Sequence, residues 1–221
     1  MNVLVVAPHA DDEILGVGGT IAKYINEGHN VYVCIATCGH PSMFSQDVLD
    51  KLRCEAKDSH SYLGIKETFF LELPAVLLSE IPKHEVNKKI NDVIDNVKPD
   101  VVFIPHFGDM HLDHSIVSQS VMVGVRPIKK HKAMDVYSYE TLSETEWNIP
   151  HMSNAFIPNT YVDISNYLDR KVKALSYFTT QLNNFPHPRS LEAIESLAKL
   201  RGSTIGVKAA EAFCLIRRIV L

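Results

Sequence analysis

Residues 3–13 read Val3-Leu4-Val5-Val6-Ala7-Pro8-His9-Ala10-Asp11-Asp12-Glu13. The first five are apolar and include three valines, and short β-branched runs of this kind are typical of a buried strand in a parallel sheet. From Asp12 onward the apolar residues recur at helical spacing, and Gly28 marks the end of that pattern. The sequence therefore predicts a buried strand that leads through a polar turn into an amphipathic helix.

The same alternation of short apolar runs with amphipathic stretches continues along the chain. Further strands are predicted at 31–36, 68–73 and 101–105, and helices at 46–63, 84–97 and 114–124. The later part is less regular, with strands predicted at 136–139, 160–163 and 212–220 and helices at 165–180 and 190–200. This pattern indicates an α/β fold with a single Rossmann-like doubly wound, mostly parallel sheet and helices on both faces. Residues 1–221 are predicted to form one domain.

The composition is that of an ordinary globular protein. Hydrophobic residues make up 46% of the 221 residues, and the net charge of −4 gives no electrostatic reason to expect nucleic acid or an anionic membrane as partner. The first residues lack the features of a signal peptide, and no apolar stretch approaches the roughly 20 residues of a transmembrane helix. None of the four cysteines belongs to a C-x-x-C pair. We therefore expect a reduced, cytoplasmic protein, and the oligomeric state stays open, a homo-oligomer included.

Two clusters of histidine and aspartate follow predicted strands that are about a hundred residues apart. The first cluster, residues 8–13, comes directly after the first strand, and the second, His111-Leu112-Asp113-His114, comes after the fourth. In open α/β sheets, ligands bind outside the carboxyl ends of the strands, where the strand order reverses. Strands one and four are neighbours there in the common order 3-2-1-4-5. The two clusters are therefore expected to meet in space.

Together the two clusters offer the ligands of a catalytic zinc site. His9 and Asp12 lie three residues apart across the strand-to-helix turn and can close on one ion, and His114 supplies a third ligand. Two histidines and one carboxylate leave a coordination position open, which is typical of a catalytic zinc site rather than a structural one. We expect one zinc ion per chain, with iron(II) or cobalt(II) as metals that can substitute.

The remaining polar residues of the clusters suit catalysis. Asp11, next to the ligand Asp12, is placed to take a proton from metal-bound water. His111 and Asp113 form a pair in which the carboxylate orients the imidazole and holds it protonated. A plainer interpretation stands beside this one, because acidic residues at the start of a helix often serve as caps and favourable first-turn charges, and H-x-D-H is also a polar loop sequence. We favour the functional interpretation because both clusters follow the strands that meet at the switch point.

Three lesser features invite interpretation. Gly16-Val17-Gly18-Gly19 lies inside the first helix, where close packing against the sheet is a better explanation than a dinucleotide site. His60 is expected at the surface of the helix at 46–63. Residues 183–189 contain two prolines and are expected to form a loop that lines or covers a site.

The two clusters resemble the paired signatures of one family, the PIG-L/LmbE-like zinc-dependent deacetylases. Residues 8–13 resemble the family's A-H-P-D-D-E signature, and residues 111–114 resemble its H-x-D-H signature. The similarity covers most of the chain, including the Arg53-x-Glu55 helix that ends at Gly64 and the late segment 210–213. Known members deacetylate N-acetylglucosamine in glycosylphosphatidylinositol, mycothiol and bacillithiol precursors, chitobiose and some glycopeptide antibiotics.

The resemblance implies a role for each matching residue. It implies that zinc is held by the three ligands named above, that Asp11 is the general base, and that His111 protonates the leaving amine or stabilises the oxyanion. It also implies that Asp113 positions His111 and that Arg53 reaches a substrate hydroxyl. Asp109 stands where some members carry a tyrosine that polarises the carbonyl, so that task falls to zinc, His111 or another donor.

The sequence leads to one hypothesis and three alternatives. The hypothesis is a zinc-dependent hydrolase that removes the acetyl group from an N-acetylated amino sugar or glycoconjugate of the N-acetylglucosamine type. The first alternative is a zinc-dependent amidase acting on another small amide, such as a thiol conjugate. The second is an iron(II) oxygenase, which has no need of the extra base Asp11. The third is a non-catalytic domain that binds a sugar or nucleotide.

Overall fold

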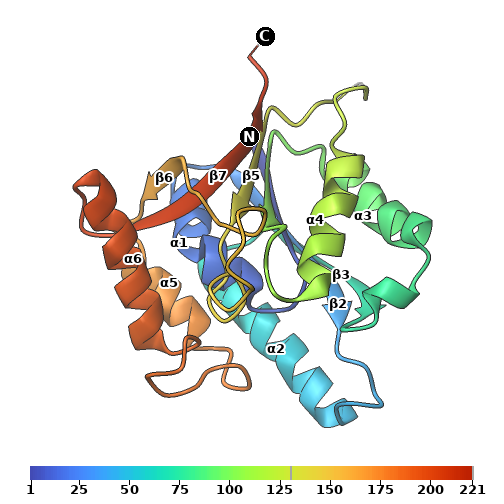
Figure 1. The fold of residues 1–221 in the computed structure, drawn as a ribbon, viewed down its shortest axis with the longest axis horizontal. Coiled ribbons are helices and arrows are strands. Elements are labelled where there is room, and N and C mark those ends of the chain that lie inside the picture. Colours follow the sequence, from blue (N-terminus) through green and yellow to red (C-terminus); the bar gives the residue numbers. More distant parts are fainter. Residues whose placement is uncertain (130, 221) are drawn as a thin grey trace.

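Within residues 1–129 and 131–220, which the computed structural model describes, seven strands form one sheet in the order β3-β2-β1-β4-β5-β7-β6 (Figure 1). The strands are β1 (Asn2–Ala7), β2 (Asn30–Cys38), β3 (Glu67–Pro74), β4 (Val101–Pro105), β5 (Asp135–Tyr139), β6 (Thr160–Asp163) and β7 (Ala210–Arg218). The helices are α1 (Asp12–Asn26), α2 (Gln46–Leu63), α3 (Lys83–Val97), α4 (Leu112–Gly124), α5 (Leu168–Leu175) and α6 (Leu191–Ile205), with a short 3-10 turn at Leu78–Glu80.

The predicted strand order 3-2-1-4-5 is confirmed. β1 pairs in parallel with β2 on one side and with β4 on the other, and β3 and β5 extend the sheet in parallel. β7 then pairs antiparallel with both β5 and β6, so the sheet is mixed but mostly parallel. The reversal of strand order between β1 and β4 places their carboxyl ends side by side.

Both faces of the sheet are buried under helices, as the continuous apolar strands predict (Figure 1). Along β1, Val3 and Val5 belong to a core shared with residues of α1, α2 and α5. Leu4 and Val6, which point to the opposite face, belong to a second core shared with α3 and α4. The predicted fold with helices on both faces is therefore confirmed.

The bounds of two helices, α5 and α4, differ from the predictions, and side-chain hydrogen bonds lie near both differences. α5 covers only Leu168–Leu175 of the helix predicted at 165–180, and the chain turns at Thr180, whose N–H and hydroxyl donate to the Glu55 carboxylate. α4 begins at Leu112, two residues earlier than predicted, and His111 caps it through its Nδ1, which accepts the Asp113 N–H. The second cluster therefore forms the start of a helix rather than a loop.

The glycines of α1 allow close packing, as predicted. A Cβ at Gly16 would collide with the ring of Tyr139 on β5, and a Cβ at Gly19 would lie 2.6 Å from Ile164. The same part of α1 is tied to a buried ion pair. The Glu211 carboxylate accepts the backbone N–H groups of Gly19 and Thr20, at 2.9 and 2.7 Å, and its Oε1 lies 2.6 Å from Lys171 Nζ. α1 is therefore held by close packing at its glycines and by hydrogen bonds to the buried Glu211 carboxylate.

No helix among the described residues is both long and apolar enough to cross a bilayer.

Candidate metal centre and active site

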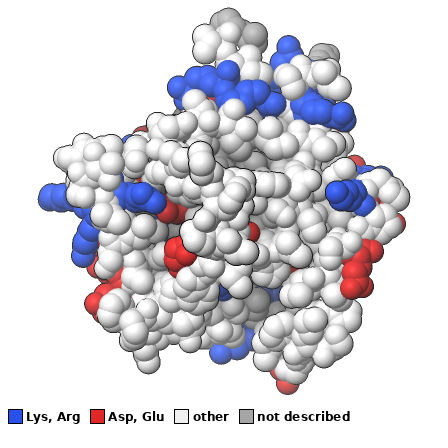
Figure 2. All heavy atoms as spheres, viewed as in Figure 1, with Lys and Arg blue, Asp and Glu red and all other residues white. Residues whose placement is uncertain are grey.

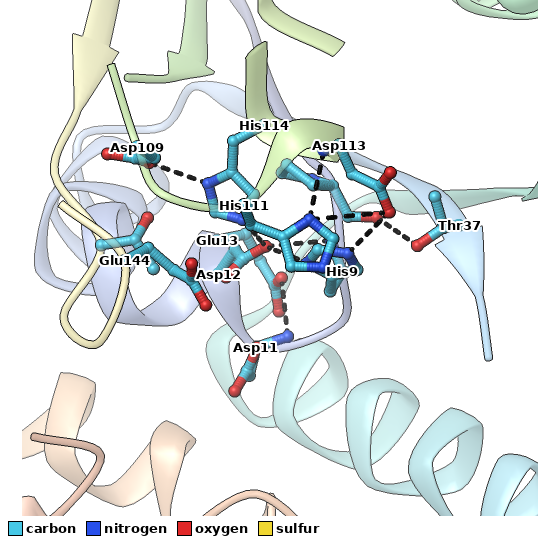
Figure 3. Close-up of polar contacts among 12 residues, drawn as sticks. His9, Asp11, Asp12, Glu13, Thr37, Asp109, His111, Asp113, His114 and Glu144 are labelled. Carbon is cyan, nitrogen blue, oxygen red and sulfur yellow. Dashed lines mark hydrogen bonds and ion pairs between the residues drawn. The ribbon is translucent and has the colours of Figure 1, made fainter. Parts of the chain in front are cut away.

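The two predicted clusters meet at the carboxyl ends of β1 and β4. The first occupies the turn after Ala7 and the start of α1, and the second occupies the start of α4. Figure 3 shows His9, Asp12, His111 and His114 gathered at this point, with Asp11, the residue before α1, below them in the view. All three predicted metal ligands and all three predicted catalytic residues therefore lie in one site. Arg53 lies apart from them.

His9 and His114 approach the same oxygen of Asp12. His9 Nδ1 lies 3.2 Å from Asp12 Oδ2 and His114 Nε2 lies 3.3 Å from it. The His9 backbone N–H also donates to this oxygen, at 2.9 Å. The turn therefore brings the first two predicted ligands together, and α4 adds the third from the other side.

A carboxylate binds the far side of each histidine ring. His9 Nε2 donates to Asp113 Oδ2 at 3.2 Å, and His114 Nδ1 donates to Asp109 Oδ2 at 2.8 Å. Asp109 is held in turn by the hydroxyl of Thr145, at 2.6 Å. Such carboxylates fix the tautomer and orientation of metal-binding histidines. They leave His9 Nδ1 and His114 Nε2 free to face Asp12.

Asp109 was not recognised as a site residue from the sequence. Its position two residues before His111 suggested only the absence of a carbonyl-polarising tyrosine. The structure shows instead that it is buried and orients His114. A spacing of five residues, with the start of α4 between them, is the only signal the sequence offers for this pair.

The pairing predicted for Asp113 differs in the structure. Its Oδ2 lies 3.9 Å from His111 Nδ1 and accepts instead from His9 and from the Val76 N–H, the latter at 2.7 Å. Burial, with the nearby charge of His9, lowers the pKa of His111 to about 4. His111 is therefore neutral near pH 7 rather than held protonated. Because its Nδ1 accepts the Asp113 N–H, its proton is on Nε2, which is a donor.

The pKa shifts of the three candidate ligands agree with the short distances between them. Burial opposes a charge on His9, but hydrogen bonds with Asp113 and Asp12 outweigh it and raise its pKa to about 9. Burial is likewise outweighed at His114, where Asp12 and Asp109 raise the pKa to about 10. Burial alone would raise the pKa of Asp12, but the two histidines hold it well below its ordinary value. Without a metal, protons on the two imidazoles supply the positive charge that the carboxylates need.

The donor set fits a divalent metal ion. The candidate ligand atoms of His9, Asp12 and His114 all lie within 4.8 Å of one another. His114 Nε2 and Asp12 Oδ1 are buried, and neither has a hydrogen-bond partner among the described residues. Buried polar atoms are normally satisfied, so unpartnered ones that converge here call for an ion. Imidazole and carboxylate ligands suit zinc.

Asp11 has an unusual backbone conformation. It is buried and precedes the first residue of α1, with φ 116° and ψ −28°. A residue other than glycine in this region stores about 1–3 kcal/mol of strain, and such strain concentrates at functional sites. Without a metal ion, burial raises the pKa of Asp11 to about 8, against the opposing charge of Arg189; a divalent cation bound at the adjacent Asp12 would lower this pKa and leave Asp11 ionised, as a base must be. Its Oδ2 lies 3.0 Å from Arg189 Nη1, whereas its Oδ1 has no partner in the described part of the chain.

Arg189 is a second residue that sequence reasoning missed. It ends the proline-containing loop at 183–189, which was expected to line or cover a site. That interpretation is supported, since the loop places the Arg189 guanidinium against the candidate base. The prolines predicted the loop, but nothing local to Arg189 connects it with a residue at the opposite end of the chain.

Arg53 lies on α2 beside a neighbouring pocket. Its guanidinium pairs with Glu72 and sits over the ring of Phe70, 4.4 Å from the centroid. The pocket has a volume of about 210 Å³ and is also lined by Ala10 of the first cluster. Arg53 therefore lines a pocket that extends to the first cluster, but it contacts Glu72 and Phe70 rather than the candidate metal ligands. Its contact with a substrate hydroxyl stays a prediction.

Basic side chains lie at several margins of the molecular surface. Figure 2 shows groups of Lys and Arg at the left, right and lower margins of this face, and another group near the two chain termini. The N-terminus leads into β1, so this edge is opposite the carboxyl ends where the clusters meet.

Known proteins share both the sequence pattern and the fold. The profile of the family described as PIG-L, GlcNAc-PI de-N-acetylase, matches residues 4–124, more than half of the 221 residues. A probable N-acetyl-alpha-D-glucosaminyl L-malate deacetylase 2 from Bacillus anthracis is 26% identical over 192 residues, which cover 81% of each chain. A diacetylchitobiose deacetylase from Thermococcus kodakarensis is 26% identical over 193 residues, covering 81% of this chain and 70% of that protein.

The fold of a conserved protein from Thermus thermophilus superimposes with a TM-score of 0.80 at 25% identity, covering 99% of this chain and 96% of that one. The family profile spans both clusters, from β1 to the end of α4. The chain therefore belongs to the PIG-L family, whose members are hydrolytic N-deacetylases.

Proposed function

We propose that this protein is a zinc-dependent hydrolase that removes the acetyl group from an N-acetylated amino sugar of the N-acetylglucosamine type, giving acetate and the free amine. Family membership supports the reaction. The names of the Bacillus anthracis and Thermococcus kodakarensis relatives support the substrate class, since both refer to N-acetylated glucosamine derivatives. The location in the cytoplasm stays a prediction, and the oligomeric state stays open.

The observation that carries the proposal is the convergence of two oriented histidines on Asp12. His9 and His114 each have one nitrogen bound to a carboxylate and the other within 3.3 Å of Asp12 Oδ2. In this proposal His9, Asp12 and His114 hold the zinc ion. When bound, zinc supplies a Lewis acid that polarises the acetyl carbonyl and lowers the pKa of water.

The other residues handle protons. Asp11 Oδ1, buried and free of protein partners among the described residues, accepts the proton of the attacking water. His111 Nε2–H donates a hydrogen bond to the acetyl oxygen as negative charge builds there, which suits its neutral state. The water oxygen bonds to the acetyl carbon, the C–N bond breaks, and the proton taken by Asp11 passes to the departing amine.

An acetate-release assay tests the proposal. The purified protein is offered N-acetylglucosamine, diacetylchitobiose and an N-acetylglucosaminyl malate, each with and without a chelator. We expect acetate from at least one of them, loss of activity with chelator and recovery on adding zinc. Acetate release only from a non-sugar amide would favour the amidase alternative. Oxygen consumption with iron(II) and no acetate would favour the oxygenase. Activity that is unchanged by the chelator would contradict the proposal that a metal ion is needed for the reaction.

A further inference from the structure

The backbone of Asp11 is held by a buried carboxylate from its own helix. The Asp11 N–H donates to Glu13 Oε2 at 3.1 Å, and the Asp11 carbonyl accepts the N–H groups of Ile14 and Leu15, at 3.0 and 2.9 Å. Hydrogen bonds therefore fix both the N–H and the carbonyl of Asp11, whose φ is 116°. A strained conformation of this kind persists only when its surroundings over-determine it.

Glu13 is held in turn from α2 and β3. His60 Nε2 donates to Glu13 Oε1 at 2.9 Å, and His60 Nδ1 accepts the hydroxyl of Thr68 at 2.8 Å. Glu13 is fully buried and His60 is 3% exposed, so the expectation of a surface histidine is wrong. The chain of contacts runs from β3 through α2 to the backbone of Asp11.

The side chain of Asp11 is held from the other end of the sequence. Arg189 Nη1 lies 3.0 Å from Asp11 Oδ2, and Arg189 Nε donates to Ser143 Oγ at 2.8 Å. The guanidinium is also 3.6 Å from a Glu144 oxygen, and the Arg189 side chain is only 17% exposed. A planar guanidinium bound at several points is a rigid clamp. It occupies Oδ2 of Asp11, whereas Oδ1 has no partner among the residues that the structure describes.

We propose that Arg189 and the Glu13–His60 pair are positioning residues that fix Asp11 for proton transfer, Arg189 at its carboxylate and Glu13–His60 at its backbone. The inference rests on the proposed role of Asp11 as the base. Neither clamp contacts the candidate metal ligands directly in the contacts above. Loss of either clamp therefore lowers kcat through Asp11 while the zinc site stays intact.

The first test removes the side-chain clamp. Arg189→Met should lower kcat about 10- to 100-fold, because misplacing a catalytic group by about 1 Å costs up to about 10²-fold. KM should change less than about twofold and zinc content should stay at the wild-type level. Arg189→Lys should recover part of the loss, and guanidinium ion should rescue Arg189→Ala. Arg201→Met is the matched control, since Arg201 forms a bidentate pair with Glu140 outside the metal centre; its kcat should match the wild type.

A double variant separates positioning from other roles. In an Asp11→Asn background, Arg189→Met should have no further effect on kcat, because Arg189 acts through Asp11. Additive losses, or a raised KM with unchanged kcat, would mean that Arg189 contacts the substrate itself, and would overturn the proposal. If Asp11→Asn alone keeps full turnover, the proposed base is wrong instead, so the two failures are distinguishable.

The backbone clamp has its own pair of variants. His60→Gln keeps a donor for Glu13 and should retain most of the wild-type kcat, whereas His60→Leu removes it and should lower kcat at least tenfold with normal zinc content. Thermal unfolding identifies any variant that has lost its fold. If His60→Leu does not fold, the kcat of His60→Gln relative to the wild type is the test of this half of the proposal. Equal kcat in wild type and a folded His60→Leu would overturn this half of the proposal.

Discussion

At the scale of single residues, each of the two histidine ligands, His9 and His114, is oriented by an aspartate that is not its neighbour in the sequence. Asp113 precedes His114 directly but binds His9, and His114 binds Asp109. Adjacent residues at the start of a helix do not face each other, so Asp113 and His114 must find partners elsewhere. The sequence could therefore supply the ligand types, but the pairing depends on how α4 docks against the turn after β1.

The Asp109 carboxylate should matter for metal affinity. Asp109→Asn keeps the size of the side chain but weakens the acceptor for His114 Nδ1–H, and loss of such a partner typically lowers metal affinity about 10- to 100-fold. Competition with a zinc chelator measures the change. Asp135→Asn is the matched control, because Asp135 pairs with Arg218 on neighbouring β-strands. Unchanged zinc affinity in Asp109→Asn would show that His114 needs no orienting carboxylate.

Zinc binding should release protons. The pKa values of His9 and His114 are raised to about 9 and about 10, so both side chains are imidazolium cations at pH 7 in the metal-free protein. A ligating imidazole must be neutral, so zinc displaces these protons and the affinity rises with pH up to about 10. Calorimetry at pH 7 in buffers of different ionisation enthalpy should show release of at least two protons. Proton-free binding, with an affinity that does not change with pH, would contradict the assigned ligands.

At the scale of elements, the strands and helices near the metal centre could be predicted, including the bounds of β4 and the start of α1, whereas the start of α4 and the end of α5 could not. The apolar period locates β1, α1 and β4 because each has a face or a pair of faces to bury. α5 ends at Leu175, and beyond it the chain is held at Thr180, whose N–H donates to the carboxylate of Glu55, 125 residues away in the sequence. No local pattern contains that contact.

The buried ion pair behind α1 should be important for stability. In Lys171→Met, the carboxylate of Glu211 stays buried without its cation, and removing one partner of a buried pair typically costs about 3–5 kcal/mol in the free energy of unfolding. Lys199→Met is the matched control, because its pair with Glu195 is exposed and worth about 0–1 kcal/mol. Denaturant unfolding of both variants gives the comparison. Equal stability of the two would contradict a structural role for Lys171.

At the scale of the whole molecule, the alternation of strands and helices was enough to predict that the two clusters meet. Short crossovers in a doubly wound sheet leave few arrangements, and the order 3-2-1-4-5 brings β1 beside β4. The antiparallel β7 and the contact of Arg189 with Asp11, 178 residues apart, follow from no such rule. They depend on where the irregular last third of the chain returns to the sheet.

The proposed division of roles between two adjacent carboxylates is tested by zinc content and kcat measured on the same preparations of Asp11→Asn and Asp12→Asn. Asp12→Asn loses an anionic ligand, so its zinc content should fall. Asp11→Asn keeps all three ligands and should bind zinc normally, with KM little changed. Its kcat should fall by about 10²–10⁴-fold, the usual value of general base catalysis. If Asp11→Asn loses its zinc while Asp12→Asn keeps it, or if Asp11→Asn retains full turnover, the proposed mechanism is wrong at its central step.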